Sequence, residues 1–147
     1  MNTDEINSLL EGEVGFLGAH ACDQIPPTGE YGCIIINSDP STLPGHHWVA
    51  LYQSGDGHSE YFDSFGLPPI VPDIQKHITY FSPFGCRVNS LALQAVNANT
   101  CGVYCVLFAL YILRGHSFQN FIGNFTSTTR SNEGTLRKLV EEFISRT

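Results

Sequence analysis

The chain has 147 residues, which is typical of one domain, and its 42% hydrophobic content is enough to form a single core. Fourteen acidic residues stand against seven scattered basic ones, which excludes the basic face typical of nucleic-acid binding. The first residues lack the basic and apolar regions of a secretory signal, and the longest apolar run is too short to span a bilayer. We therefore expect one soluble, intracellular domain over residues 1–147.

The N-terminal part predicts a short helix and a buried strand. Residues 4–11 carry apolar side chains at helical spacing behind Thr3, a candidate N-cap. Residues 31–37 are apolar and β-branched, and Pro- and Gly-containing turn signals lie on both sides of them. We expect this strand to lie inside a sheet.

The next segment predicts a β-hairpin that brings a histidine close to an acid. Residues 47–53 and 58–63 flank the turn sequence 54–57. If the loop is the centre of the hairpin, paired residues have numbers that sum to about 111, so His47 faces a position within one residue of Asp63. A carboxylate that accepts one imidazole N–H orients the ring, and the other ring nitrogen can then take a proton from a thiol. We expect His47 to be a base and Asp63 its orienting group.

His46 is the alternative base, because the sequence pattern separates the two neighbours poorly. His47 begins the apolar alternation of the strand, whereas His46 lies on the Pro44-Gly45 turn, so we favour His47. The remaining histidines have no comparable context and are expected at the surface: His20, His58, His77 and His116.

The second half of the chain predicts three peripheral helices and one more strand. Residues 72–81 form a helix with proline in its first turn, and residues 87–94 partly alternate as a strand would. Residues 118–125 and 132–144 form amphipathic helices.

Residues 101–113 form the longest apolar run and predict a helix buried on all sides. A polar loop leads directly to Cys101, so its thiol lies at the helix N-terminus, where the dipole and free N–H groups favour a thiolate. We expect Cys101 to be a nucleophile, with Gly102 allowing a close approach of another backbone. Cys105 is surrounded by apolar residues, which favours burial over a zinc site shared with Cys101 and the histidines. We expect no metal.

Gln94 and the other cysteines have weaker signals. Gln94 lies at the end of the predicted strand, seven residues before Cys101, and either it is structural or its amide joins the Cys101 N–H in holding an oxyanion. Trp48 is expected to pack beside the site. An odd number of cysteines at irregular spacing makes disulfides unexpected, and three are expected to be ordinary semi-buried thiols: Cys22, Cys33 and Cys86.

Three segments in this order carry a resemblance to a known family: residues 45–50 around His47-Trp48, residues 61–66 around Asp63, and residues 94–105 from Gln94 through Cys101. Over roughly residues 15–113 the chain resembles the adenain family of adenovirus-type cysteine proteases. The similarity is greatest to the adenain-like proteases of Maverick/Polinton elements and related DNA viruses, in which Asp occupies the acid position.

The resemblance implies a papain-like α+β fold with a nucleophile helix packed on a central β-sheet that carries His and Asp. It implies that Cys101 is the nucleophile, His47 the base, Asp63 its orienting carboxylate and Gln94 the oxyanion donor. It also implies an endopeptidase that processes virion precursor proteins at small-residue, glycine-containing sites. Such an enzyme would act in the cytoplasm or nucleus of the host, or packaged in the virion.

The chain departs from adenain in being shorter and acidic. We therefore expect neither the DNA nor the peptide that adenain uses as cofactors, and Cys86 does not match the position of a cofactor-linking cysteine. Two alternatives remain open at this point: a protease of ubiquitin-like (SUMO-type) conjugates, which shares the order His, Asp, Gln, Cys, and a noncatalytic virion or interaction protein that keeps the fold.

Overall fold

A computed structural model describes residues 1–143. Five strands form one sheet in the order β1-β2-β3-β4-β5, with the bounds β1 Phe16–Ala21, β2 Gly32–Asn37, β3 Trp48–Gln53, β4 His58–Phe62 and β5 Gly85–Val88. The three inner strands pair antiparallel with one another, whereas each edge strand pairs in parallel with its inner neighbour. The helices are α1 Thr3–Leu10, the 3-10 turn η1 Cys22–Gln24, α2 Pro72–Phe81, α3 Cys101–Leu113, α4 Phe118–Ile122 and α5 Thr129–Phe143.

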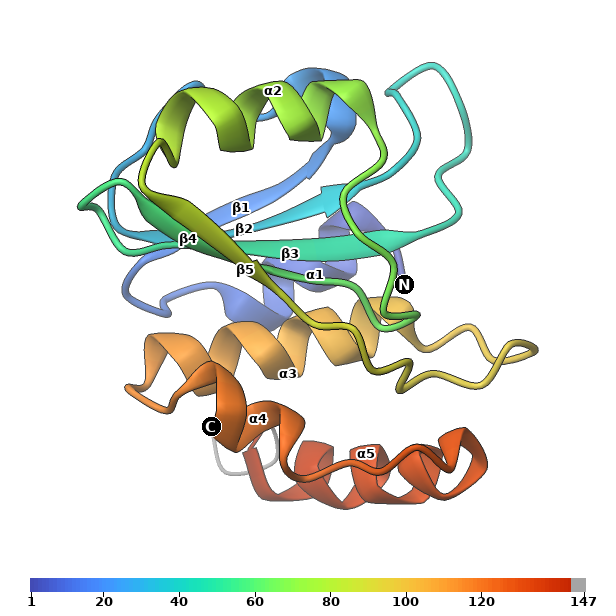
Figure 1. Cartoon of the computed structure of the whole chain (residues 1–147). Coiled ribbons are helices and arrows are strands. Elements are labelled where there is room, and N and C mark those ends of the chain that lie inside the picture. Colours follow the sequence, from blue (N-terminus) through green and yellow to red (C-terminus); the bar gives the residue numbers. More distant parts are fainter. Residues whose placement is uncertain (144–147) are drawn as a thin grey trace.

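The elements form layers on both sides of the sheet, as Figure 1 shows. Helix α2 covers one face, where it packs on Ile34, Ile36 and Leu51. Helices α1 and α3 cover the opposite face, and α4 and α5 lie beyond α3. Helix α3 is therefore enclosed between the sheet and the C-terminal helices, which explains why its sequence is apolar all round. This arrangement confirms the predicted α+β, papain-like class.

Most of the predicted elements are present, with shifts of a few residues. Strand β2, the β3–β4 hairpin, α2 and α3 lie where the sequence predicts them. Helix α1 was predicted with the wrong cap: Asn2 accepts from the Glu5 N–H at 2.9 Å, and the Glu5 carboxylate accepts from the Asn2 N–H in return. The N-cap of this capping box is therefore Asn2, one position before the predicted Thr3.

The remaining elements differ from the prediction in four ways. The strand predicted over residues 87–94 is limited to β5, because residues 89–100 turn away from the sheet. Strand β1 was not predicted, since its sequence contains a glycine and no β-branched residue. Helix α4 ends at Ile122, before the predicted residue 125. The predicted last helix starts earlier, at Thr129, and its predicted final residue, Ile144, lies outside the described residues. Among the described helices, none combines the length and apolar character needed to cross a bilayer.

Candidate active site

His47 and Asp63 lie side by side where β3 begins and β4 ends. The His47 Nε2 is 2.9 Å from Asp63 Oδ1, and the two side chains are 21% and 5% exposed. The observed hairpin register pairs Ala50 with Phe62, so paired numbers sum to 112 and the predicted sum was one too low. This difference matters, because it makes His47 and Asp63 diagonal neighbours on the same face of the hairpin, whereas the predicted register sends them to opposite faces.

The Asp63 carboxylate is held from two directions. Its Oδ1 also accepts from the Phe65 N–H at 2.8 Å, which leaves Oδ2 free of this bond. The backbone of Asp63 pairs with the side chain of Asn89: the Asp63 N–H donates to Asn89 Oδ1 at 2.9 Å, and Asn89 Nδ2 donates to the Asp63 carbonyl at 2.7 Å. The Phe65 ring stacks on the His47 imidazole at a centroid distance of 5.1 Å. Asp63 and His47 are thus fixed before any substrate binds.

Sequence reasoning missed Asn89. It is buried, and it acts on Asp63 from 26 positions along the chain. An asparagine after a strand carries no signal for such a contact, because its partner is determined by where the irregular segment after β5 crosses β4.

Cys101 is the first residue of α3, and it is 8% exposed beside His47 and the start of β3. Burial alone would raise its pKa, but a hydrogen bond from His47, the backbone of Trp48, the charge of His47 and the backbone of Gly102 together lower it below the ordinary value of 9.0. Burial alone would lower the pKa of His47, but Asp63 and Cys101 outweigh this effect and raise the pKa to about 9. The pair therefore favours a thiolate beside an imidazolium.

Cys105 provides an internal comparison on the same helix. It is fully buried, and desolvation raises its pKa well above 9.0. One turn of helix thus separates a thiol with a lowered pKa from an inert one, as the apolar surroundings of Cys105 predicted. All five cysteines are free.

Gln94 is buried and its amide is oriented on both sides. Its Oε1 accepts from the Ser64 hydroxyl at 2.6 Å, and its Nε2 donates to the Ala98 carbonyl at 2.7 Å. An amide nitrogen has two hydrogens, so one N–H remains after the bond to Ala98. These contacts link Gln94 to the residue after Asp63 and to the loop that leads into Cys101. The prediction that it ends a strand was wrong, because it lies in the irregular segment after β5.

The other histidines lie elsewhere. His46 points to the surface, with its side chain 79% exposed and its Nδ1 2.8 Å from Asp39 Oδ2. His58 and His116 are exposed, as predicted. The surface prediction for His77 was wrong: it lies on the buried face of α2, its Nε2 is 2.6 Å from Gln53 Oε1, and burial lowers its pKa. His77 falls on the same helical face as Ile74, three residues before it.

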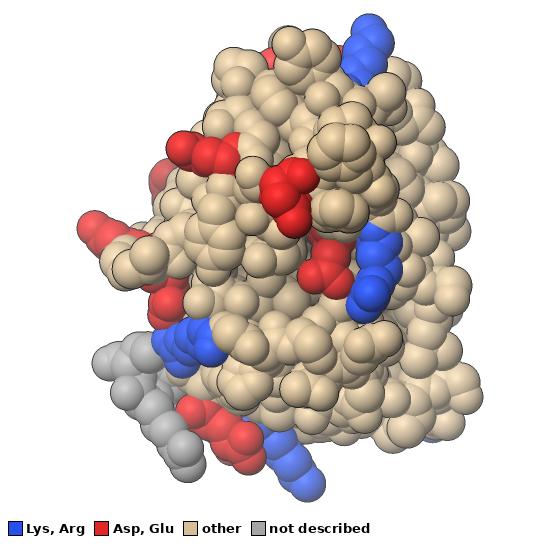
Figure 2. Space-filling model, turned by 60° about the vertical axis from the view of Figure 1, so that its left-hand side comes forward, with Lys and Arg blue, Asp and Glu red and all other residues tan. Residues whose placement is uncertain are grey.

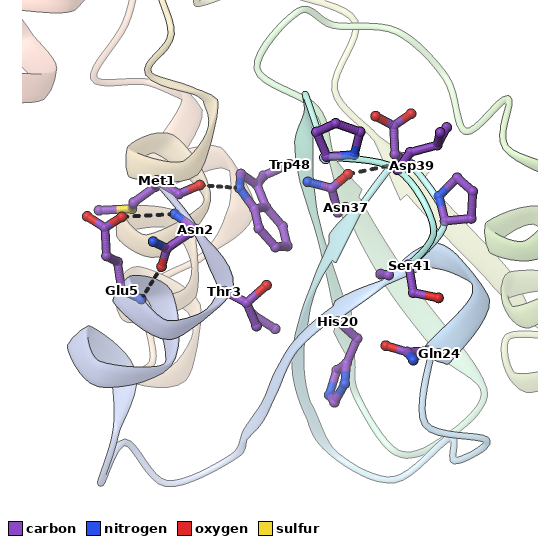
Figure 3. A pocket seen from close by; sticks show the side chains of 16 residues that line it. Met1, Asn2, Thr3, Glu5, His20, Gln24, Asn37, Asp39, Ser41 and Trp48 are labelled. Carbon is purple, nitrogen blue, oxygen red and sulfur yellow. Dashed lines mark hydrogen bonds between the residues drawn. The ribbon is translucent and has the colours of Figure 1, made fainter.

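A groove of about 540 Å³ is lined by Trp48, the residue after His47, but not by His47, Asp63, Gln94 or Cys101 themselves. Figure 3 shows the start of α1 on one side of it, Asn37, Asp39 and Ser41 on the other, and Trp48 between Met1 and Asn37. The Trp48 indole N–H donates to the Met1 carbonyl at 2.9 Å, and a Cβ added to Gly102 would lie 2.9 Å from the Met1 Cβ. Trp48 is buried beside the site, as predicted: its backbone helps to lower the pKa of Cys101, and its indole lies against Gly102.

A helix that begins with a cysteine and packs on a sheet that carries His and Asp is the arrangement of a papain-like cysteine protease fold. A protein of Acanthamoeba polyphaga mimivirus that is named as a thiol protease is 32% identical over 111 residues, which are 69% of this chain and 36% of the relative. The cysteine protease of African swine fever virus is 30% identical over 113 residues, or 73% of this chain and 41% of the relative. The protease of bovine adenovirus 7 is 28% identical, with 89% of this chain and 76% of the relative covered. The chain belongs to this adenain-like family of cysteine proteases.

The chain spans less than half the length of the mimivirus and African swine fever virus relatives. No protein-family model matches it. Two solved structures share its fold. A crystal structure of the African swine fever virus protease has a TM-score of 0.52 at 20% identity, and the match covers 78% of this chain and 43% of the solved chain. The central domain of a Legionella pneumophila protein has a TM-score of 0.57 at 14% identity, and the match covers 99% of this chain and 96% of that domain.

Proposed function

We propose that this chain is a cysteine endopeptidase in which Cys101 is the nucleophile, His47 the acid and base, and Asp63 the group that orients His47. The observation that carries the proposal is the hydrogen bond of the His47 imidazole to Asp63, beside a Cys101 that raises the His47 pKa while His47 lowers the pKa of Cys101. Since Nε2 faces Asp63, Nδ1 is the nitrogen left for exchange with the thiol. A stored thiolate and imidazolium need no proton transfer before attack.

The reaction then follows from the groups present. The Cys101 sulfur attacks the carbonyl carbon of the scissile bond, and the electron pair of the carbonyl moves to its oxygen. The Cys101 N–H and the free N–H of Gln94 donate to this oxyanion. The electron pair returns as the C–N bond breaks, and His47 gives its proton to the leaving nitrogen. Water, deprotonated by His47, cleaves the resulting thioester and regenerates the thiolate.

We propose the groove beside Trp48 as the place where the substrate chain binds. The large indole of Trp48 lines this groove and lies against Gly102, the residue after Cys101, which supports selection of small residues, glycine among them, by steric exclusion. The kinship with viral proteases supports precursor proteins of a virus or virus-like element as substrates. On this proposal the enzyme acts inside the host cell or in the virion.

The enzyme is proposed to work without DNA. Figure 2 shows single lysine and arginine side chains that lie apart from one another among acidic ones. Two of the bases are paired with acids, Arg87 with Glu60 at 3.8 Å and Arg114 with Glu13. Few bases are then left to neutralise phosphates, which is the source of salt-dependent DNA affinity.

The test compares cleavage of a peptide that contains a Gly-Gly site with cleavage of the same peptide carrying Leu in place of each glycine. We expect cleavage of the first alone, at a rate that duplex DNA leaves unchanged at low and physiological salt. Faster release from a ubiquitin-like Gly-Gly amide reporter would instead indicate a deconjugating protease. Lack of cleavage of all three by the folded chain would contradict the proposal.

A further inference from the structure

Helix α5 contacts the segment that carries Gln94 and ends directly before Cys101, although the helix lies outside the region of motif resemblance. Residues 93–100 have no regular structure, and they hold Gln94 and lead into Cys101. A loop of this kind positions groups accurately only if its ends are fixed by neighbouring elements. Two adjacent residues of α5, Asn132 and Glu133, provide such contacts at both ends of the loop.

Glu133 spans the first turn of α3 with its carboxylate. Its Oε1 accepts from the Thr100 hydroxyl at 2.8 Å, and its Oε2 accepts from the Tyr104 hydroxyl at 2.9 Å. These two donors lie one residue before Cys101 and three residues after it. Thr100 is the N-cap residue of α3, and its side chain makes no capping bond; its hydroxyl donates to Glu133. One carboxylate therefore fixes the turn that presents the thiol.

Tyr104 is committed to this contact. Its ring is fully buried, and burial together with Glu133 raises its pKa, so its hydroxyl keeps the proton that it donates. The same hydroxyl lies 3.3 Å from the Leu93 carbonyl at the other end of the loop. A hydrogen bond to an ionised group is stronger than a neutral one, so the shorter contact to Glu133 dominates.

Asn132 fixes the start of the loop. It is 1% exposed, and its Nδ2 donates to the carbonyls of Leu93 at 3.2 Å and Thr126 at 2.7 Å. Its Oδ1 accepts from the Thr126 N–H at 2.9 Å, so each hydrogen-bonding group of the amide is used. Leu93 directly precedes Gln94, so this contact fixes the backbone from which the Gln94 amide extends.

We propose that Glu133 is a positioning residue for the active site, which sets the placement of the Cys101 thiol against His47 through Thr100 and Tyr104. Asn132 supports it at the opposite end of the loop. Helix α5 then has two roles: it covers α3, and it holds the first turn of α3, which carries Cys101, in place against the sheet. This proposal rests on the proposed function for its catalytic consequence, but the placement of Cys101 is measurable without any substrate.

The experiment measures the rate of Cys101 alkylation by iodoacetamide against pH in the wild type, Glu133→Ala and Glu133→Gln, with mass spectrometry to select the Cys101 peptide. Glu141→Ala is the matched control, because Glu141 is an exposed acid on the same helix. In Glu133→Ala we expect the midpoint of the alkylation profile to move to higher pH. The Cys101 thiol would no longer be held where His47 lowers its pKa. Turnover of the peptide should fall by roughly tenfold or more in kcat with KM little changed.

Glu133→Gln should recover part of the wild-type profile, since its amide oxygen still accepts one bond and the Thr100 hydroxyl can accept from its NH₂. Tyr104→Phe removes one donor and keeps the buried ring, so a loss of kcat in this variant separates positioning from packing. The proposal is overturned if folded Glu133→Ala keeps the wild-type alkylation profile and differs only in melting temperature. If the wild type has no peptidase activity, the proposed function fails, but the alkylation profiles still decide the role of Glu133.

Discussion

Replacing Asp63 by Asn should lower the pKa of His47 while leaving the site assembled. The amide oxygen of Asn can still accept from His47 and from the Phe65 N–H, and the Asn89 contacts involve only the backbone of residue 63. The change therefore removes a charge and little else. Asp63 is the first of the groups that raise the His47 pKa against the effect of burial.

The magnitude follows from the pKa of His47. A rise from 6.5 to about 9 corresponds to about 3 kcal/mol in favour of the imidazolium, at about 1.4 kcal/mol per pH unit. Asp63 supplies the larger share and Cys101 the rest, so Asp63→Asn should return the His47 pKa to the neutral range or below. At pH 8 the thiolate and imidazolium pair would be mostly lost, and kcat/KM should fall by roughly tenfold to a hundredfold.

The same shift has a consequence for stability with a defined sign. A pKa that is higher in the folded state than the unfolded value of 6.5 stabilises the fold fully below pH 6.5, and this contribution is lost as the pH rises through about 9. The wild type should therefore exceed Asp63→Asn in stability most clearly in mildly acidic solution, and the difference should shrink above about pH 9.

The assay is the pH dependence of kcat/KM together with urea unfolding at pH 6 and pH 10. Asp56→Asn is the matched control, because Asp56 contacts the exposed His58 in the same way, away from the groove. An alkaline limb of activity near pH 9 in the wild type that moves down in Asp63→Asn alone agrees with the reasoning. Identical pH profiles for the wild type and Asp63→Asn would refute it.

Three further predictions concern the remaining polar groups. His47→Ala should abolish turnover and His46→Ala should leave it near the wild-type rate, since only His47 contacts Asp63; loss of activity in His46→Ala would contradict this choice. Gln94→Ala should lower kcat by roughly a hundredfold or more with little change in KM, whereas a lower melting temperature with normal specific activity would indicate a structural role. Burial lowers the pKa of His77 in the folded state, so on acidification the unfolded chain binds a proton at His77 before the folded chain does, and the melting temperature should fall as the pH drops below 6.5. His77→Gln should show a smaller fall in melting temperature over the same pH range. An equal fall in both proteins would exclude His77 as the source of the acid sensitivity.

The sequence predicted the parts of the site that depend on local pattern. Cys101 is recognisable because a polar loop meets an apolar run, and the His47 to Asp63 contact because four turn residues separate two strands. The exact register was not predictable from the loop alone, since pairing could shift by one residue and reverse the face of Asp63. His47 and Asp63 lie on the same face because the observed pairing differs by one residue from the predicted one.

The supporting contacts were beyond sequence reasoning for a physical reason. Asn89 reaches Asp63 across 26 positions, and Glu133 reaches Thr100 across 33, so neither pair belongs to one local element. Their geometry depends on how α5 and the segment after β5 pack against α3 and β4. His77 was misplaced for a similar reason: its burial depends on which face of α2 meets the sheet, and there Gln53 provides its partner.

The central claim is that Cys101 is a thiolate nucleophile at neutral pH, and selective alkylation tests it most directly. The chain has five free cysteines, and burial raises the pKa of the other four. A substoichiometric amount of iodoacetamide at pH 7 should therefore modify Cys101 first, with loss of peptide cleavage in proportion to the modified fraction, and Cys101→Ala should be inactive and resist labelling. Preferential labelling of another cysteine, or cleavage by Cys101→Ala near the wild-type rate, would contradict the account.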